Sequence, residues 1–240
     1  MNTPLHCTDY DLHLQASLNH LMSYPQYLPF IGNAWANQTN RVLFIAESHY
    51  FHEKSNGKSN SQTWYVENAS NLHPEELNWT DTRGVVERAD KGKFRSKGLS
   101  IFYNLKSAIE STLEIKNSKE TMFQNFGYYN YFQRPAEVSG KSIRNMNIDN
   151  EIAYQTLTAI CEHAKPTVII FVSSRAKNSF DSVHKRLNLV QFDSSHIYQV
   201  PHPACAWWNR KSKSFSKTGE AISGKRKFMN IIKELDLKLV

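Results

Sequence analysis

The side chains best suited to chemistry follow apolar segments or fall within them. The run 47–50, Glu-Ser-His-Tyr, follows a short apolar stretch, Asn130 lies within an aromatic stretch, and His202 follows a third. A carboxylate and an imidazole can exchange protons with a substrate, and an amide can contact both donors and acceptors. Each residue alone also fits a structural role in a turn or at a strand end. Their shared position predicts a site, because a parallel sheet brings its strand ends to one edge.

Apolar runs predict the elements that hold these residues. Strands are expected over 41–46, 126–132, 166–172 and 195–200. Helices are expected over 11–23, over 100–112, behind a cap at Asp149, after residue 173 and before the C-terminus. In the first of these helices, the predicted buried stripe is Leu14, Leu18, Leu21 and Met22. Strands that alternate with helices predict one α/β domain over 1–240, a three-layer α/β/α sandwich around a mainly parallel four-stranded sheet.

The segment 52–98 is polar and shows no sustained periodicity, so it is expected to be a long irregular insertion. The most apolar stretch covers only 168–172, far short of the ~18 residues that span a bilayer, and the start has no signal-peptide pattern. We therefore expect a soluble, cytoplasmic protein. The three cysteines, Cys7, Cys161 and Cys205, lie far apart and are expected to be free thiols.

Basic residues outnumber acidic ones, with 29 Lys and Arg against 22 Asp and Glu and a net charge of +7. Such a balance favours an anionic partner, either nucleic acid or an anionic membrane surface. The charge does not distinguish between the two.

Several segments resemble, in the same order, the motifs of the uracil-DNA glycosylase superfamily. Residues 42–50 are similar to the strand that ends in Gly-Gln-Asp-Pro-Tyr or Gly-Glu-Ala-Pro-Gly, and 200–206 to its His-Pro-Ser-Pro motif. The segments 99–106, 128–135 and 168–176 resemble the helix behind the base pocket, the strand with the pocket Asn, and a later core strand. The resemblance covers about residues 41–208.

This resemblance implies a reaction site for a base that is flipped out of the DNA. It assigns catalysis to Glu47 and His202, with Ser48 in place of the family's Asp and His49, in place of its Pro, as an additional donor or acid/base. The base-binding residues that it implies are Asn130, which would read the base, and Tyr50 and Phe51, which would wall the pocket.

The wedge residue of the family falls at Ala206, so the two tryptophans after it are expected to stack or wedge instead. The predicted DNA-binding residues are Trp207, Trp208, Arg210, Lys211 and Lys213. Three scattered cysteines cannot hold the iron–sulfur cluster of the Gly-Glu-Ala-Pro-Gly branch, so no metal and no cofactor are expected. We expect a monomer whose partner is duplex or single-stranded DNA, without membrane contact.

The function predicted from the sequence is therefore hydrolysis of the N-glycosidic bond of a modified or damaged base, or of uracil, in DNA repair or in defence against foreign DNA. A different class remains open, a non-catalytic module that binds nucleic acid or nucleotides on the same fold. A nuclease or other hydrolase that needs clustered acidic metal ligands ranks last, because the site strands offer only one acid, Glu47.

Overall fold

The computed structural model describes residues 4–55, 59–67, 72–92, 97–115, 122–187 and 196–239. Its centre is a sheet of five strands in the order β1-β3-β2-β4-β5. The strands are β1 (Phe30–Ile31), β2 (Val42–Ala46), β3 (Gly127–Asn130), β4 (Val168–Phe171) and β5 (Ile197–Gln199). Strands β3, β2, β4 and β5 are parallel, and β1 pairs antiparallel with β3. The expected sheet was four-stranded. It lacked β1, whose two residues between Pro29 and Gly32 are too short to give a periodic signal.

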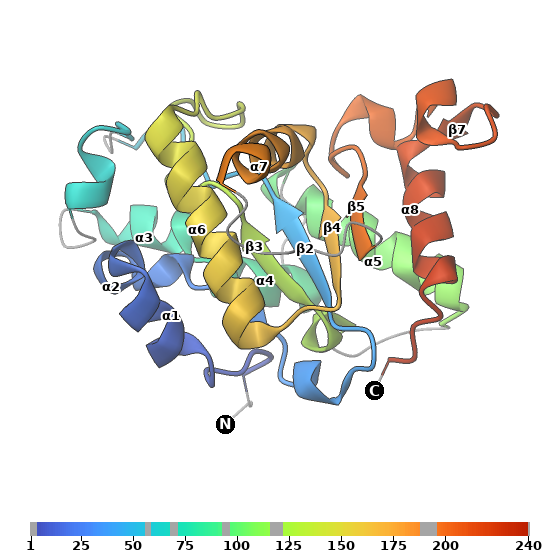
Figure 1. Cartoon of the computed structure of the whole chain (residues 1–240), viewed down its shortest axis with the longest axis horizontal. Helices are drawn as coiled ribbons and strands as arrows, with labels where there is room; N and C mark the ends of the chain where they lie inside the picture. Colours follow the sequence, from blue (N-terminus) through green and yellow to red (C-terminus); the bar gives the residue numbers. More distant parts are fainter. Residues whose placement is uncertain are drawn as a thin grey trace.

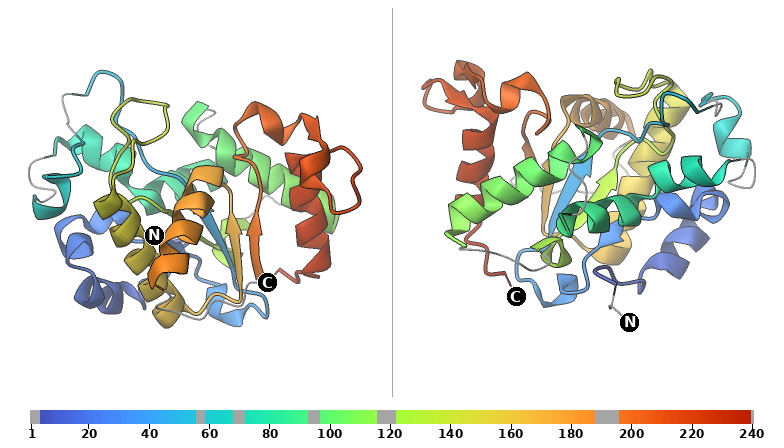
Figure 2. Two further views of the ribbon diagram at one scale, coloured as in Figure 1. Left: turned by 45° about the horizontal axis from the view of Figure 1, so that its top comes forward. Right: turned by 180° about the vertical axis from the view of Figure 1, so that it is seen from behind.

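Helices cover both faces of the sheet (Figure 1). The larger ones are α5 (Ser100–Leu113), α6 (Asn147–Ala164), α7 (Ser174–Leu187) and α8 (Gly224–Glu234). Side chains of β2 alternate between two cores, with Leu43 and Ile45 on the side of α6 and α7, and Phe44 on the side of α5 and α8. The view from behind shows α4 and α5 crossing the second face (Figure 2). Strand β2 is buried at every position, as its unbroken apolar run predicts for a central parallel strand.

The first helix is interrupted where one continuous helix was expected. The chain forms α1 (Asp11–Ser17) and α2 (Asn19–Ser23), separated by Leu18 in an extended conformation with φ −139° and ψ 95°. The break changes the face that α2 presents to the core. Leu21 is fully buried, whereas Met22 is 66% exposed and was wrongly placed in the buried stripe.

The predicted irregular insertion contains two helices, α3 (Pro74–Thr80) and α4 (Thr82–Asp90). Helix α3 starts at a capping box in which His73 and Glu76 satisfy each other's backbone amides. Helix α4 starts at Asp81, whose carboxylate accepts from the Gly84 N–H at 3.0 Å. These local signals fix the helix starts despite the weak hydrophobic pattern. Residues 56–58, 68–71 and 93–96 of the predicted insertion lie outside the described residues.

Asp149 caps α6 from inside the first turn and not from the N-cap position. The N-cap is Met146, and the Asp149 carboxylate reaches back to accept from the Met146 N–H at 2.7 Å. The predicted strand over 195–200 is β5, and Ser195 lies outside the described residues.

An excursion of the chain over 206–223 joins β5 to α8. It holds the short antiparallel pair β6 (Lys211–Ser212) and β7 (Ile222–Ser223). Figure 1 shows this excursion at the end of the molecule to which β2 points. Short 3-10 helices complete the described chain: η1 (Pro25–Tyr27), η2 (Trp35–Asn37), η3 (Trp64–Val66), η5 (Lys97–Leu99), η6 (Met122–Asn125), η8 (Ala206–Trp208) and η9 (Lys213–Phe215). No helix in the described ranges is long and apolar enough to cross a bilayer.

Candidate active site

A pocket of about 470 Å³ opens at the carboxyl end of the parallel strands. Its wall combines residues that follow β2, β4 and β5 with residues of the excursion. The lining residues are Glu47, Ser142, Ser173, Ser174, Arg175, Pro201, His202, Cys205, Trp207, Ser212, Ser214 and Phe215. This edge of a parallel sheet is where α/β folds place their ligands, because loops from several strands converge there.

Glu47 follows β2, and its carboxylate is oriented by three groups. Its Oε2 accepts from the Ser173 hydroxyl at 3.1 Å, and its Oε1 accepts from the Ile143 N–H at 3.3 Å. The Arg175 Nε lies 3.8 Å from Oε1, and the Glu47 side chain remains 18% exposed. The carboxylate is therefore held in place and still accessible from the pocket.

His202 follows β5 and has a defined tautomer. Its Nδ1 accepts from the Ala204 N–H at 3.1 Å, so the proton of the neutral ring lies on Nε2. Burial lowers the pKa of His202, and the nearby Glu47 carboxylate opposes that shift. The imidazole is consequently neutral near pH 7, with Nε2–H as a hydrogen-bond donor.

His49 lies outside the pocket lining, in a buried polar contact. Its Nε2 is 3.0 Å from the Asn130 amide nitrogen and 2.9 Å from the Thr82 hydroxyl. Because the amide NH₂ can only donate, Nε2 is the acceptor and the ring proton lies on Nδ1. Burial lowers the pKa of His49 to about 3. The ring is thus a neutral structural partner of Asn130 at neutral pH.

The residues predicted to bind the base are likewise absent from the pocket lining. Phe51 is 6% exposed and packs near Trp64, with ring centroids 6.1 Å apart. Tyr50 is half-buried, and its ring lies 6.0 Å from that of Trp79. Asn130 is buried and directs its NH₂ group to His49. Ser48, of the predicted catalytic set, is half-buried and also lies outside the lining.

The two adjacent tryptophans of η8 have opposite environments. Trp207 is 50% exposed and lines the pocket, with Phe215 in an edge-to-face arrangement at 6.3 Å. Trp208 is 2% exposed and packs against Phe228, with ring centroids 5.6 Å apart. The prediction that both contact DNA conflicts with the burial of Trp208, which belongs to the core. The predicted cations Arg210, Lys211 and Lys213 are all exposed on the excursion.

Ser173 and Arg175 are site residues that sequence reasoning did not select. Both lie within four residues of the end of β4, so the rule that singled out Glu47 at the end of β2 also applies to them. Ser142 comes from an irregular segment. Ser212, Ser214 and Phe215 come from β6 and η9, which are too short to give a periodic signal.

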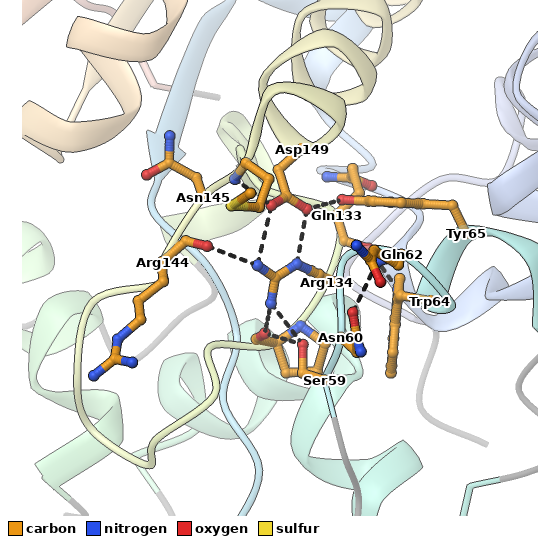
Figure 3. Close-up of polar contacts among 12 residues, drawn as sticks. Ser59, Asn60, Gln62, Trp64, Tyr65, Gln133, Arg134, Arg144, Asn145 and Asp149 are labelled. Atoms are coloured by element: carbon orange, nitrogen blue, oxygen red, sulfur yellow. Dashed lines mark hydrogen bonds and ion pairs between the residues drawn. The ribbon is translucent and has the colours of Figure 1, made fainter.

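Figure 3 shows the polar contacts of Arg134, a buried arginine near the start of the segment that carries the lining residue Ser142. Arg134 is 1% exposed and forms two contacts with Asp149, Nε to Oδ1 at 2.7 Å and Nη2 to Oδ2 at 3.0 Å. It also donates to the Arg144 carbonyl at 2.9 Å, and Tyr65 donates to Asp149 at 2.9 Å. These contacts fix the segment 135–146, which supplies the Ile143 N–H to Glu47.

Across the residues that the structure describes, no three His, Cys, Asp or Glu side chains gather in a way that could hold a metal ion. The three cysteines form no disulfide, and Cys205 is the one that lines the pocket.

The pocket brings together Glu47, His202 and Trp207 from the predicted site and leaves the other predicted catalytic and base-binding residues outside its lining. No family model, no curated protein and no solved structure matches the chain.

Proposed function

We propose that this protein is a DNA glycosylase-like hydrolase that takes a flipped base into the pocket and hydrolyses its N-glycosidic bond. The observation that carries the proposal is the placement of the Glu47 carboxylate and the His202 imidazole in one pocket at the carboxyl edge of the sheet. A general base and a hydrogen-bond donor that face one cavity suit the addition of water and the departure of a base.

The chemistry assigns a different role to each group. As the bond between the sugar carbon and the base nitrogen breaks, positive charge grows on the sugar and negative charge on the base. Glu47 stabilises the sugar charge and accepts a proton from the attacking water, whose oxygen bonds to the sugar carbon. His202 donates a hydrogen bond from Nε2–H to the departing base, which finally takes up one proton. The products are an abasic sugar and the free base.

Binding of DNA is supported by the excursion. Trp207 offers a half-exposed aromatic face at the pocket, and Arg210, Lys211 and Lys213 are exposed on the same segment. Aromatic faces stack on unpaired bases, and cations neutralise the flanking phosphates. Extruding one nucleotide costs a few kcal/mol, which such contacts can offset. The substrates proposed are modified or damaged bases or uracil, in repair or in defence against foreign DNA.

One observation favours a non-catalytic nucleic-acid or nucleotide-binding module as the second candidate. Asn130, the amide expected to read the base, is buried and donates to His49. A pocket without that contact could bind a nucleotide without aligning it for cleavage.

The test is a cleavage assay on oligonucleotides that carry uracil or a modified base, and on naturally modified phage DNA. Alkali converts each abasic site into a strand break. Breaks that disappear in Glu47→Gln and in His202→Ala support the glycosylase. The absence of breaks in every substrate, together with salt-sensitive DNA binding by the wild-type protein, supports the binding module.

A further inference from the structure

Serine hydroxyls form much of the pocket wall besides Glu47 and His202. Ser212 and Ser214 lie in the excursion, with their hydroxyl oxygens 2.8 Å apart. Ser174, at the start of α7, accepts from the Gln199 amide at 3.0 Å, which leaves its own hydroxyl hydrogen free to donate. A hydroxyl is neutral and serves as both donor and acceptor. This wall therefore suits a neutral ligand group that also donates and accepts.

The aromatic part of the wall suits a flat ring. Trp207 is half-exposed at the pocket, and Phe215 meets its ring edge-to-face at 88°. The face of an exposed tryptophan can stack on a base, a contact worth about 1–3 kcal/mol per base in single-strand binding proteins. The excursion thus combines a stacking surface with a pair of hydroxyls.

The size of the pocket exceeds the needs of a bare pyrimidine ring. Its 470 Å³ lies within the range of sites that take drug-sized ligands. A base that carries an additional polar group would fill more of this space and reach the serine hydroxyls.

We infer that the pocket selects a nucleobase with a neutral, hydroxyl-bearing substituent, such as a hydroxymethyl group or a sugar attached to it. Ser212 and Ser214 read the hydroxyls of that substituent, and Trp207 stacks on the ring. This inference rests on the proposed function, since it names the class of base that enters the same site.

The test uses oligonucleotides that differ at one base only: cytosine, 5-hydroxymethylcytosine and its glucosylated form, and uracil with 5-hydroxymethyluracil. Binding is measured by fluorescence anisotropy with Glu47→Gln protein, and base release by single-turnover assays with wild-type protein. Two hydrogen bonds to the substituent correspond to a preference of about tenfold for the hydroxyl-bearing base. The double variant Ser212→Ala with Ser214→Ala should lose this preference.

The excursion provides a matched control. Ser216 and Thr218 repeat the same arrangement, with their hydroxyl oxygens 2.8 Å apart, but neither residue lines the pocket. The double variant Ser216→Ala with Thr218→Ala should therefore retain the tenfold preference.

The two readouts separate this inference from the proposed function. Equal binding of hydroxyl-bearing and unmodified bases overturns the inference, even if bases are released and the glycosylase assignment holds. Preferential binding that depends on Ser212 and Ser214, without release of any base, supports the inference and overturns the hydrolytic function.

Discussion

The hydroxyl of Ser173 joins the start of α7 to the carboxylate of Glu47. It donates to Glu47 Oε2 at 3.1 Å, and the Ser173 hydroxyl oxygen accepts from the Ala176 N–H at 3.3 Å. One buried side chain therefore both caps a helix and orients the proposed general base. The position of Glu47 depends on β4 and α7 as much as on its own strand.

Replacement of Ser173 by Ala should reduce base release or ligand binding more than it reduces stability. A hydrogen bond to a charged group contributes about 1.5–3 kcal/mol, which corresponds to a loss of at least tenfold in single-turnover rate. Loss of the helix cap should cost about 1 kcal/mol in urea unfolding. Ser179→Ala is the control, because Ser179 lies on the same helix and donates to Asn150 at 2.7 Å, away from the pocket. Similar rates for the two variants would contradict an orienting role of Ser173.

Gly224 allows α8 to approach the loop that carries His202. A Cβ at this position would lie 2.8 Å from Pro201 Cγ and 2.9 Å from the Trp207 carbonyl oxygen. In Gly224→Ala the loop must shift, and a displacement of about 1 Å near a reacting group can cost 10²-fold in rate. We expect a large loss in base release or ligand affinity. Arg226→Ala is the control, because Arg226 is exposed on the same helix. Unchanged activity in Gly224→Ala would mean that the loop adapts without moving His202.

The Arg134–Asp149 pair should be the most sensitive ion pair of those described here. Removing one partner of a buried pair leaves an uncompensated charge, at a cost of about 3–5 kcal/mol. Arg134→Met should therefore lower the free energy of unfolding in urea by that amount. Arg186→Met is matched to it, because Arg186 pairs with Glu151 at 2.8 Å while the two side chains are 56% and 42% exposed. A surface pair of this kind contributes about 0–1 kcal/mol, so equal losses in both variants would refute the structural role of Arg134.

His49 should make stability depend on pH. An unfolded histidine titrates near pH 6.5, whereas burial lowers the pKa of His49 to about 3 and that of His20 to about 4. At a pH between the folded and the unfolded pKa of each histidine, the unfolded chain binds a proton that the folded chain does not. The free energy of unfolding should therefore fall as the pH drops below about 6.5, by about 1.4 kcal/mol per pH unit for each histidine. Urea unfolding of His49→Gln between pH 6.5 and 4.5 should show a shallower slope, and parallel curves would contradict the burial of a neutral ring.

The elements that the sequence predicts well are those with a strong local signal. Strands β2 and β4 are unbroken apolar runs that are buried at every position, and α5 closely matches its predicted bounds. No proline or glycine marks the break at Leu18, and the apolar residues on either side of it keep a helical spacing, so the sequence predicts one continuous helix.

The predicted convergence of Glu47 and His202 follows from parallel strands alone. The diversion of Asn130 to His49 also depends on Thr82, whose helix has only a weak apolar pattern.

The two tryptophans of η8 are adjacent in the sequence, and their residue types alone do not show which one is buried. A single 3-10 turn directs Trp207 to the pocket and Trp208 into the core against Phe228. Trp207→Ala should weaken binding of an oligonucleotide about tenfold or more and leave urea unfolding nearly unchanged, because one stacked base contributes about 1–3 kcal/mol. Trp208→Ala should lower the free energy of unfolding by about 3–5 kcal/mol through the cavity it leaves. If Trp208→Ala weakened DNA binding instead, and Trp207→Ala lowered the free energy of unfolding, Trp207 would not belong to the proposed site.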